Sequence, residues 1–391
     1  MKRSEFLQFS PPDIGPEEIA AVVECLRSGW ITSGPRAAKF EEEFSAYVGA
    51  PAALALSSGT AALHCALVAL GVGPGDAVIV PTMTFASAAH VVEHVGARPV
   101  LVDSEARTLN IDPDAVERAL DDPAVRCIAP VHLHGHPCDM TRIVQMAEAR
   151  GLAIVEDAAH ALPASVDGVL VGGARRNVPS LAAFSFYATK NLTTGEGGML
   201  SGPSELVSEA RSWSLHGMTR DAWRRNEAGG SFAYDVTRAG FKYNMADLQA
   251  AIGLVQLGRL DAMHTRRREI AARYSEALGS SEAIEVPVRH AGYSHAWHIY
   301  SVRLRLEQLT IDRARFVSEL ESLGIGTSVH FLPVHLFSYY ENRYGYTPAD
   351  LPVATREYQR LVSLPMHSRM TDQDVDDVVE AVSAVLGRHR R

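Results

Sequence analysis

The chain has 391 residues, of which 47% are hydrophobic and 21% charged, and its formal net charge is −9. This length is typical of two domains, and this composition excludes a disordered chain. No apolar run of about 18 residues is present, and the first 18 residues lack the apolar stretch of a signal peptide, so we expect a cytoplasmic protein without a membrane span. The acidic balance argues against a general nucleic-acid surface.

Cysteine and lysine are both used sparingly. The four cysteines lie far apart without a C-x-x-C pair, which is typical of reduced thiols in the cytoplasm. Of the 37 basic residues only four are lysines: Lys2, Lys39, Lys190 and Lys242. Arginine stays protonated and cannot act as an amine nucleophile, so a lysine inside a polar and aromatic motif needs a chemical reason.

Short apolar runs and amphipathic stretches alternate along the first two thirds of the chain. The sequence predicts helices over 16–29, 39–49, 61–71, 85–96, 113–120 and 140–151 and strands over 52–56, 77–81, 98–103, 125–133, 152–157, 181–189 and 197–202. Nearly continuous apolar strands between helices indicate a mainly parallel sheet that is buried on both faces. From about residue 255 the pattern changes to long helices over 257–279, 311–324 and 371–387 and a strand over 297–306, which predicts a smaller α+β domain.

The turn Ser57-Ser58-Gly59-Thr60 lies between a predicted strand and a predicted helix. Its hydroxyls, its glycine and the free N–H groups of a helix start suit a phosphate group. A helix cap without any ligand explains the same residues, so the turn alone leaves both interpretations open.

Two charged side chains follow later strands. Asp157 ends the apolar run LAIVED, where it either pairs with a buried cation or caps the next helix. Lys190 follows the strand LAAFSF and precedes a glycine-rich segment. A partly desolvated lysine can lose its proton and react with an aldehyde, whereas a solvated lysine remains a surface charge.

Phe85 follows the strand AVIV and either stacks on a flat ring or packs in the core. Together with the turn at Gly59, Asp157 and Lys190, it completes the contacts that pyridoxal 5′-phosphate needs: a phosphate cradle, a stacking aromatic, a carboxylate for the ring nitrogen and an amine for the aldehyde.

The segment His132-Leu133-His134-Gly135-His136-Pro137-Cys138 was tested as a metal site. Alternate histidines on a strand would face one side, but Gly135 and Pro137 interrupt a strand and no carboxylate is spaced to complete the ligand set. We expect a loop that lines the pocket, and no metal.

Several long motifs resemble those of the DegT/DnrJ/EryC1/StrS family of sugar aminotransferases. They are SGWITSGP, SSGTAALHCALVALGVGPGD, VEDAAHA, FSFYATKNLTTGEGGM, GFKYNMADLQAAIGLVQLGRLD and GIGTSVHFLPVH, and the likeness extends from residue 8 to about residue 385. The resemblance implies a fold-type I enzyme that depends on pyridoxal 5′-phosphate and works as a homodimer with shared active sites. It also implies an N-terminal segment over 1–30, a large cofactor-binding domain with a seven-stranded sheet over 31–255 and a small domain over 256–391.

The resemblance assigns roles to individual residues. It implies that Lys190 holds the cofactor, that Asp157 pairs with the ring nitrogen and that His160 lies near the phenolic oxygen. It places Phe85 on the ring, and it places Gly59, Thr60 and Ser185 at the phosphate. Asn244 corresponds to a residue that reaches the phosphate of the neighbouring subunit's cofactor, in a K-Y-N motif where many members have Y-N-Y-R.

The K-Y-N motif, the segment 216–223 and the motif around His330 are similar to the branch that aminates C4 of nucleotide-linked keto sugars. His330 is a candidate for the sugar pocket, although a packed histidine in a turn explains it equally well. Arg220, Arg224 and Arg225 are candidate phosphate contacts or a solvated basic turn.

The sequence therefore predicts an aminotransferase that passes the amino group of L-glutamate, through pyridoxamine 5′-phosphate, to C4 of a sugar such as dTDP-4-keto-6-deoxyglucose. Amination at C3 of a nucleotide sugar or of a cyclitol, a non-catalytic regulator with this fold, and a metal hydrolase at 132–138 are the alternatives. The branch that dehydrates sugars has histidine in place of the lysine, and Lys190 argues against it.

Overall fold

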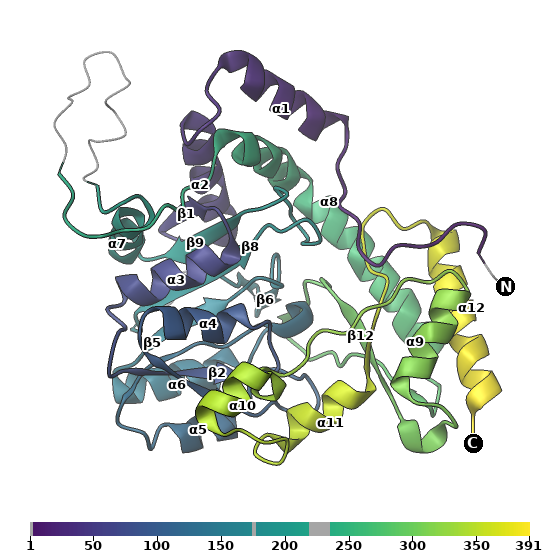
Figure 1. The fold of residues 1–391 in the computed structure, drawn as a ribbon. Coiled ribbons are helices and arrows are strands. Elements are labelled where there is room, and N and C mark those ends of the chain that lie inside the picture. Colours follow the sequence, from purple (N-terminus) through teal and green to yellow (C-terminus); the bar gives the residue numbers. More distant parts are fainter. Residues whose placement is uncertain (1–2, 174–176, 219–234) are drawn as a thin grey trace.

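The computed structural model describes residues 3–173, 177–218 and 235–391. A seven-stranded sheet lies at its centre, with the strand order β1-β9-β8-β5-β4-β2-β3 (Figure 1). Only β9 runs antiparallel to its neighbours in this sheet, and the remaining pairs are parallel. Its strands are β1 (Ala52–Leu56), β2 (Ala77–Pro81), β3 (Arg98–Val102), β4 (Val125–Ile128), β5 (Ala153–Asp157), β8 (Ser180–Ser185) and β9 (Gly198–Gly202).

Helices cover both faces of this sheet, as the apolar strands predict. One face packs against α3 (Gly59–Ala69), α4 (Ser87–His94) and α7 (Ser204–Ser214), and the other against α2 (Pro35–Val48), α5 (Pro113–Ala119) and α6 (Met140–Arg150). In β2, Val78 and Val80 belong to the first layer and Ile79 to the second. Side chains of one strand thus serve two cores, which explains why its run is continuously apolar.

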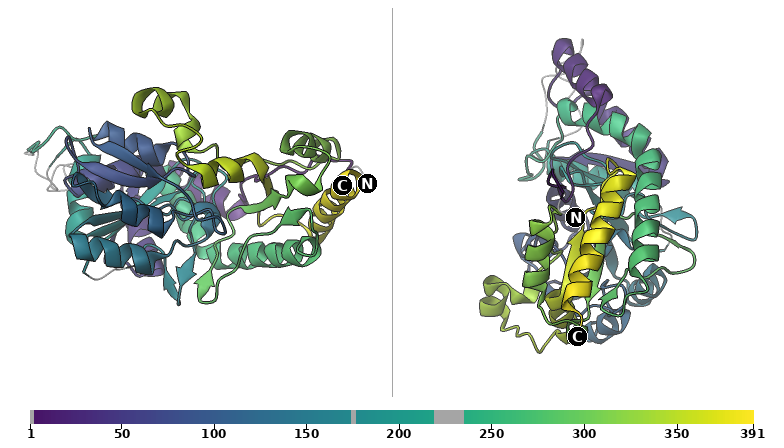
Figure 2. Two further views of the ribbon diagram at one scale, coloured as in Figure 1. Left: turned by 90° about the horizontal axis from the view of Figure 1, so that it is seen from below. Right: turned by 90° about the vertical axis from the view of Figure 1, so that its right-hand side faces the viewer.

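A separate core lies at the C-terminal end of the chain. The antiparallel strands β10 (Ile284–Glu285), β12 (Tyr300–Leu304) and β13 (Leu361–Leu364) pack there against α9 (Arg313–Ser322) and α12 (Asp372–His389). Figure 2 shows this second unit beside the large one, joined to it by the long helix α8 (Asp247–Leu278). Leu260 of α8 belongs to a core under the large sheet, whereas Tyr274 belongs to the C-terminal core, so one helix connects the two cores.

Several boundaries differ from the predicted ones. The strand predicted over 125–133 ends at Ile128 and is followed by Pro130, which has no N–H for a sheet, and by the turn η1 (Leu133–Gly135). The strand predicted over 297–306 begins at Tyr300, because Trp297 has a positive φ of 50°. Helix α8 begins ten residues before its predicted start, and its buried Asp247 accepts hydrogen bonds from the N–H groups of Arg36 and Ala37 at the start of α2.

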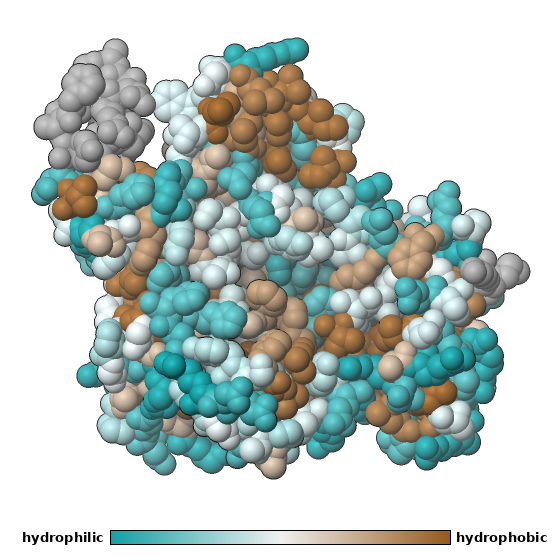
Figure 3. All heavy atoms as spheres, viewed as in Figure 1, coloured by the Kyte–Doolittle hydropathy of each residue, from teal (hydrophilic) through white to brown (hydrophobic). Residues whose placement is uncertain are grey.

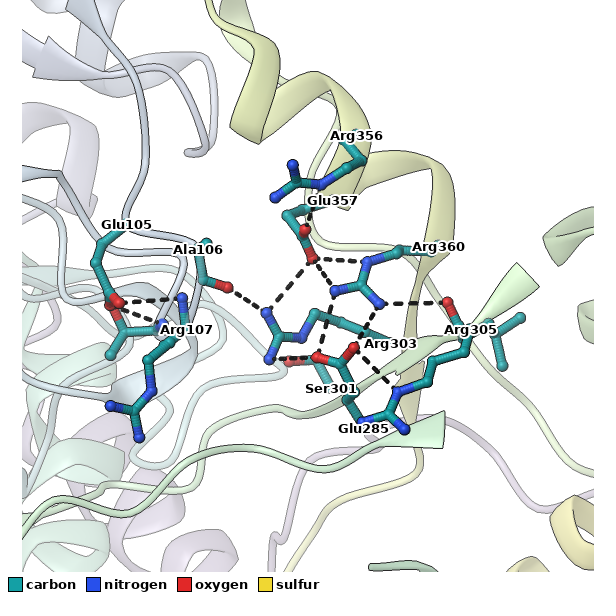
Figure 4. A network of polar contacts seen from close by, with 12 residues as sticks. Glu105, Ala106, Arg107, Glu285, Ser301, Arg303, Arg305, Arg356, Glu357 and Arg360 are labelled. Carbon is teal, nitrogen blue, oxygen red and sulfur yellow. Dashed lines mark hydrogen bonds and ion pairs between the residues drawn. The ribbon is translucent and has the colours of Figure 1, made fainter. Parts of the chain in front are cut away.

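The segment after residue 330 returns to the large sheet. Tyr340 of α10 (Ser338–Tyr344) and Leu351 pack with the residues of the α3 and α4 layer. Helix α11 (Pro352–Arg360) is tied to the C-terminal sheet by a network of ion pairs in which the carboxylate of Glu357 lies 2.8 Å from Arg360 and 3.4 Å from Arg303 (Figure 4). The segment that carries His330 is held separately, by the pairing of Ser328 with Ser363 and by the bond between His330 and Ser363.

The remaining described elements are α1 (Pro16–Ser28), the short turns η3 (Leu306–Gln308) and η4 (Val334–Leu336), and a small sheet of β6 (Ser165–Val166), β7 (Val169–Leu170) and β11 (Tyr293–Ser294). Within the described ranges, no helix has both the length and the apolar character needed to cross a membrane.

Candidate active site

A cavity of about 420 Å³ opens where β5 and β8 end and α3 begins. In an open α/β sheet this edge is the usual place for a ligand. Almost all of the candidate residues line this cavity: Gly59, Thr60, Phe85, Asp157, His160, Ser185, Lys190 and His330. Residues that lie up to about 270 positions apart in the sequence are therefore neighbours here.

The start of α3 forms one end of the cavity. Ser58 caps the helix, with its Oγ accepting a hydrogen bond of 3.0 Å from the N–H of Ala61. The first N–H groups of a helix have no partner inside the helix, so those of Gly59 and Thr60 are available to a ligand. A Cβ at Gly59 would lie 2.9 Å from the Cβ of Ser185, and only glycine permits this approach of α3 to the end of β8. The cradle therefore fits a phosphate group.

Asp157 and Lys190 carry opposite charges into the middle of the cavity. Burial raises the pKa of the Asp157 carboxyl, although a hydrogen bond of 3.0 Å from the N–H of Ala159 to Oδ1 acts in the other direction. Burial lowers the pKa of Lys190 to about 8, against the opposing effect of Asp157. The lysine is thus much closer to its neutral, nucleophilic form at neutral pH than a solvated lysine.

The hydrogen bonds of His160 fix its tautomer. The N–H of His134 donates to Nδ1 of His160 at 3.2 Å, so this nitrogen carries no proton. Burial holds the pKa of His160 well below its usual value, and the neutral ring must therefore carry its proton on Nε2. His160 offers a hydrogen-bond donor on the side of the ring that lines the cavity.

Aromatic rings form the wall opposite the sheet. Phe85 is 60% exposed, although it lies at the end of an apolar strand, and its ring centroid lies 5.8 Å from that of Phe331. Phe331 stacks on His160, and Phe9 stacks on His330. The exposure of Phe85 excludes the core-packing interpretation and leaves its ring free for a flat ligand.

Asn244 does not line this cavity. It borders a neighbouring cavity together with Ser33, whose Oγ accepts a hydrogen bond of 2.6 Å from Nδ2 of Asn244, and its Oδ1 accepts a bond from Lys242. The structure contains one subunit, so the predicted contact with a neighbouring subunit's cofactor stays a prediction.

The histidines of 132–138 have other partners. Nε2 of His132 lies 3.0 Å from the carboxylate of Glu156, and the ring of His134 bonds to Ser301 and to the carbonyl of His330. Among the described residues, no group of histidine, cysteine and carboxylate side chains is arranged to hold a metal ion. The prediction that this loop lines the pocket is wrong, because none of residues 132–138 lines the cavity; the loop supports it instead through the bond from His134 to His160.

Two contributors were missed from the sequence. Phe331 and His298 line the cavity, and neither stands in a pattern that distinguishes it from a packed aromatic residue. The structure does not describe residues 219–234. The predicted segment 216–223 is therefore described only up to residue 218, and the candidates Arg220, Arg224 and Arg225 lie outside the described residues.

Several known proteins are similar to this chain in sequence and in fold. The sequence profile of the DegT/DnrJ/EryC1/StrS aminotransferase family matches residues 12–383. The chain is 46% identical over 387 residues to the spore coat polysaccharide biosynthesis protein SpsC of Bacillus subtilis, covering 98% of each chain. It is 43% identical over 391 residues to an uncharacterized protein of Methanocaldococcus jannaschii, covering 100% of each chain.

Among solved structures, the PMP-form of the putative sugar aminotransferase Spr1654 from Streptococcus pneumoniae superposes with a TM-score of 0.90 at 36% identity, over 98% of this chain and 99% of that one. The same protein has been solved in a PLP-form, which confirms the predicted cofactor class. The predicted fold-type I architecture and enzyme class are confirmed as well. The chain belongs to the DegT/DnrJ/EryC1/StrS aminotransferase family.

Proposed function

We propose that this enzyme transfers the amino group of L-glutamate to C4 of a nucleotide-linked 4-keto-6-deoxy sugar, such as dTDP-4-keto-6-deoxyglucose. The observation that carries the proposal is the meeting of Lys190, Asp157, His160 and the start of α3 in one cavity of a sugar aminotransferase fold. The K-Y-N motif at 242–244 supports the C4 branch. The name of the relative SpsC, which refers to polysaccharide biosynthesis, agrees with a sugar substrate.

The residues present fit pyridoxal 5′-phosphate. Gly59, Thr60 and Ser185 would hold its phosphate, and the carboxylate of Asp157 would pair with its ring nitrogen. His160 would donate from Nε2 to the phenolic oxygen, and Phe85 would stack on the ring. When bound, the cofactor supplies an aldehyde that exchanges amino groups and a ring that accepts electrons from the substrate carbon.

The chain's own residues move the protons. Lys190, with its pKa lowered to about 8, would be available as a free amine beside the bound substrate. Its Nζ would take the proton from the α-carbon of glutamate, and a water molecule would supply the carbonyl oxygen of 2-oxoglutarate while the amino group stays behind. In the second half of the cycle the same nitrogen would deliver a proton to C4 of the sugar. Asp157 would favour the protonated form of the ring nitrogen.

A transfer assay tests the substrate. The purified enzyme with pyridoxal 5′-phosphate is given ¹⁵N-labelled L-glutamate and dTDP-4-keto-6-deoxyglucose, and the product is analysed by NMR. We expect ¹⁵N on C4 and one 2-oxoglutarate per amino sugar. The matching 3-keto sugar and a cyclitol ketone serve as controls, and faster transfer to either would contradict the C4 assignment. A protein that performs its cellular role equally well with Lys190→Ala would be a regulator instead.

A further inference from the structure

His298 lines the active-site cavity and is only 5% exposed. It lies in the turn before β12, and its ring centroid lies 4.5 Å from that of His160 at an interplanar angle of 39°. The two rings are thus tilted against each other in close contact. Two rings that share a hydrogen bond between their nitrogens meet edge to edge, with their centroids farther apart than this. His160 and His298 are therefore not hydrogen-bonded to each other, and each ring bonds to other groups.

The partner of His298 is the residue next to the proposed catalytic lysine. Nδ2 of Asn191 donates to the carbonyl oxygens of Leu162 at 2.9 Å and Ala296 at 2.8 Å. Carbonyls only accept, so the amide nitrogen of Asn191 is unambiguously placed and its Oδ1 is the atom 3.2 Å from Nδ1 of His298. Because Oδ1 can only accept, Nδ1 of His298 carries the proton.

The second nitrogen of the ring is therefore an acceptor. Burial, with the positive charges of Lys190 and Arg267 nearby, holds the pKa of His298 well below its usual value, so the ring is neutral and Nε2 carries a lone pair. The backbone around it is firmly held, since Ala296 donates to Gly135 at 2.9 Å and the buried Arg267 donates to the carbonyls of Trp297 and His298. Two residues that line the cavity thus carry a fixed donor, on His160, and a fixed acceptor, on His298.

The acceptor nitrogen of His298 can distinguish the sugar from glutamate. The carboxylates of glutamate are acceptors only, so they gain nothing from Nε2 of His298, whereas every hydroxyl of a sugar is a donor. We propose that His298, oriented by Asn191, is a specificity-determining residue that accepts a hydrogen bond from a ring hydroxyl of the sugar, adjacent to the carbon that is aminated. This inference rests on the proposed function and adds a named contact to it.

Two variants separate this contact from support of the fold. In His298→Asn the amide can still donate to Asn191 but does not reach the cavity, and in His298→Phe the ring remains against His160 without either nitrogen. His264→Asn is the matched control, because His264 bonds to the carbonyl of His295 in the same segment at 3.0 Å and does not line the cavity.

The two half-reactions are followed separately by the absorbance of the bound cofactor, in enzyme loaded with pyridoxal 5′-phosphate. The sugars are dTDP-4-keto-6-deoxyglucose and its analogues without the 2-hydroxyl or the 3-hydroxyl. We expect both His298 variants to lose about tenfold in the sugar half-reaction and less than twofold with glutamate. On the 3-deoxy analogue this difference from wild type should vanish, as a double-mutant cycle requires for a direct contact, and on the 2-deoxy analogue it should remain, because only the 3-hydroxyl is adjacent to C4. His264→Asn should keep the wild-type preference among the three sugars.

Other results overturn the inference. An equal loss on all three sugars, or a similar loss with glutamate, would mean that His298 supports the fold or assists Lys190. If His298→Asn fails to bind the cofactor, His298→Phe alone decides by the same cycle, and a failure of both to bind it also rejects a contact limited to the sugar. A wild-type enzyme that reacts with glutamate and with none of the sugars would refute the proposed function and this contact together.

Discussion

At the scale of single residues, the site depends on groups whose charge or tautomer is set by their neighbours. Asp157 has an exposed fraction of 5% and a pKa that burial raises, so a carboxylate here needs a positive partner to remain ionised. A protonated ring nitrogen supplies such a partner, and Lys190 supplies another. A positive charge near Asp157 therefore keeps its carboxylate ionised, and the carboxylate in turn stabilises that positive charge.

Asp157→Asn should keep the cofactor bound but slow the transfer of the amino group by about 100-fold or more, because the ring nitrogen loses the charge that holds its proton. Single-turnover reactions with glutamate measure this rate. Asp114→Asn, which removes an exposed ion-pair partner of Arg142, is the control and should react as fast as wild type. A rate for Asp157→Asn within about twofold of wild type would disprove the pairing.

Buried histidines make the stability of the protein depend on pH. Burial lowers the pKa values of His134 and His136 to about 4 and of His330 to about 3, below the ordinary value near 6.5. Below pH 6.5 the unfolded chain therefore binds more protons than the folded one, and stability is lost as the pH falls. Each such histidine contributes up to about 1.4 kcal/mol per pH unit.

Urea unfolding at pH 7, 6 and 5 checks this effect in a range where most carboxylates stay ionised. The free energy of unfolding should fall steadily toward pH 5, and less steeply in His136→Phe than in wild type. A free energy that stays constant from pH 7 to pH 5 would show that these rings are not held neutral.

At the scale of elements, the sequence predicts most of the large sheet and little of how the segments after residue 280 return to it. The strands β1, β2 and β5 were predicted to within a residue, because each is a short apolar run that ends at a turn or a polar residue. Helices α10 and α11 were not predicted, because they are only seven and nine residues long and bury few apolar side chains.

The residues of the site also fall into those that the sequence predicts and those that it does not. Gly59, Asp157 and Lys190 follow strand ends, and their types indicate their chemistry, so a linear pattern was enough to select them. His298 and Phe331 come from segments that reach the cavity only through tertiary packing, and the acceptor nitrogen of His298 follows from the amide of Asn191. The domain boundaries after residues 30 and 255 stay predictions.

The ion-pair network of α11 offers a test of how the C-terminal segments are held. Glu357→Gln removes the buried carboxylate between Arg303 and Arg360 and leaves the two arginines with Glu285 alone as their ion-pair partner. It should lower the free energy of unfolding by about 3 kcal/mol. Arg356→Ala, which removes a 61% exposed partner of the same carboxylate, should cost less than about 1 kcal/mol.

Urea denaturation at pH 7 measures both variants. Equal and small losses would mean that water already screens the network, and that α11 is held by its apolar contacts alone.

In the molecule as a whole, the surface over α1 is unusually hydrophobic. Figure 3 shows a continuous hydrophobic area over α1. Its large apolar side chains are Ile14, Ile19, Val23, Leu26 and Ile31, exposed by 41%, 59%, 37%, 53% and 49%. A monomer rarely leaves a patch of this kind in water. We propose that it contributes to the homodimer that the resemblance implies.

Leu26→Glu should therefore weaken the dimer, because the partner would have to bury a charge. Light scattering after size exclusion should give a dimer for wild type and a larger monomer fraction for the variant at micromolar concentration. Val169→Glu, at a 60% exposed position in the small sheet, is the control and should stay dimeric. A monomeric wild-type protein, or a variant as dimeric as wild type, would exclude α1 from the interface.

We propose that Lys190 holds pyridoxal 5′-phosphate, and mapping the covalent adduct is the decisive measurement. The loaded protein is reduced with borohydride, digested and sequenced by mass spectrometry, with Lys190→Ala treated in parallel. We expect one modified peptide, with the adduct on Lys190, and no specific visible absorbance in the variant. An adduct on Lys2, Lys39 or Lys242 instead, or the same absorbance in Lys190→Ala, would contradict the account.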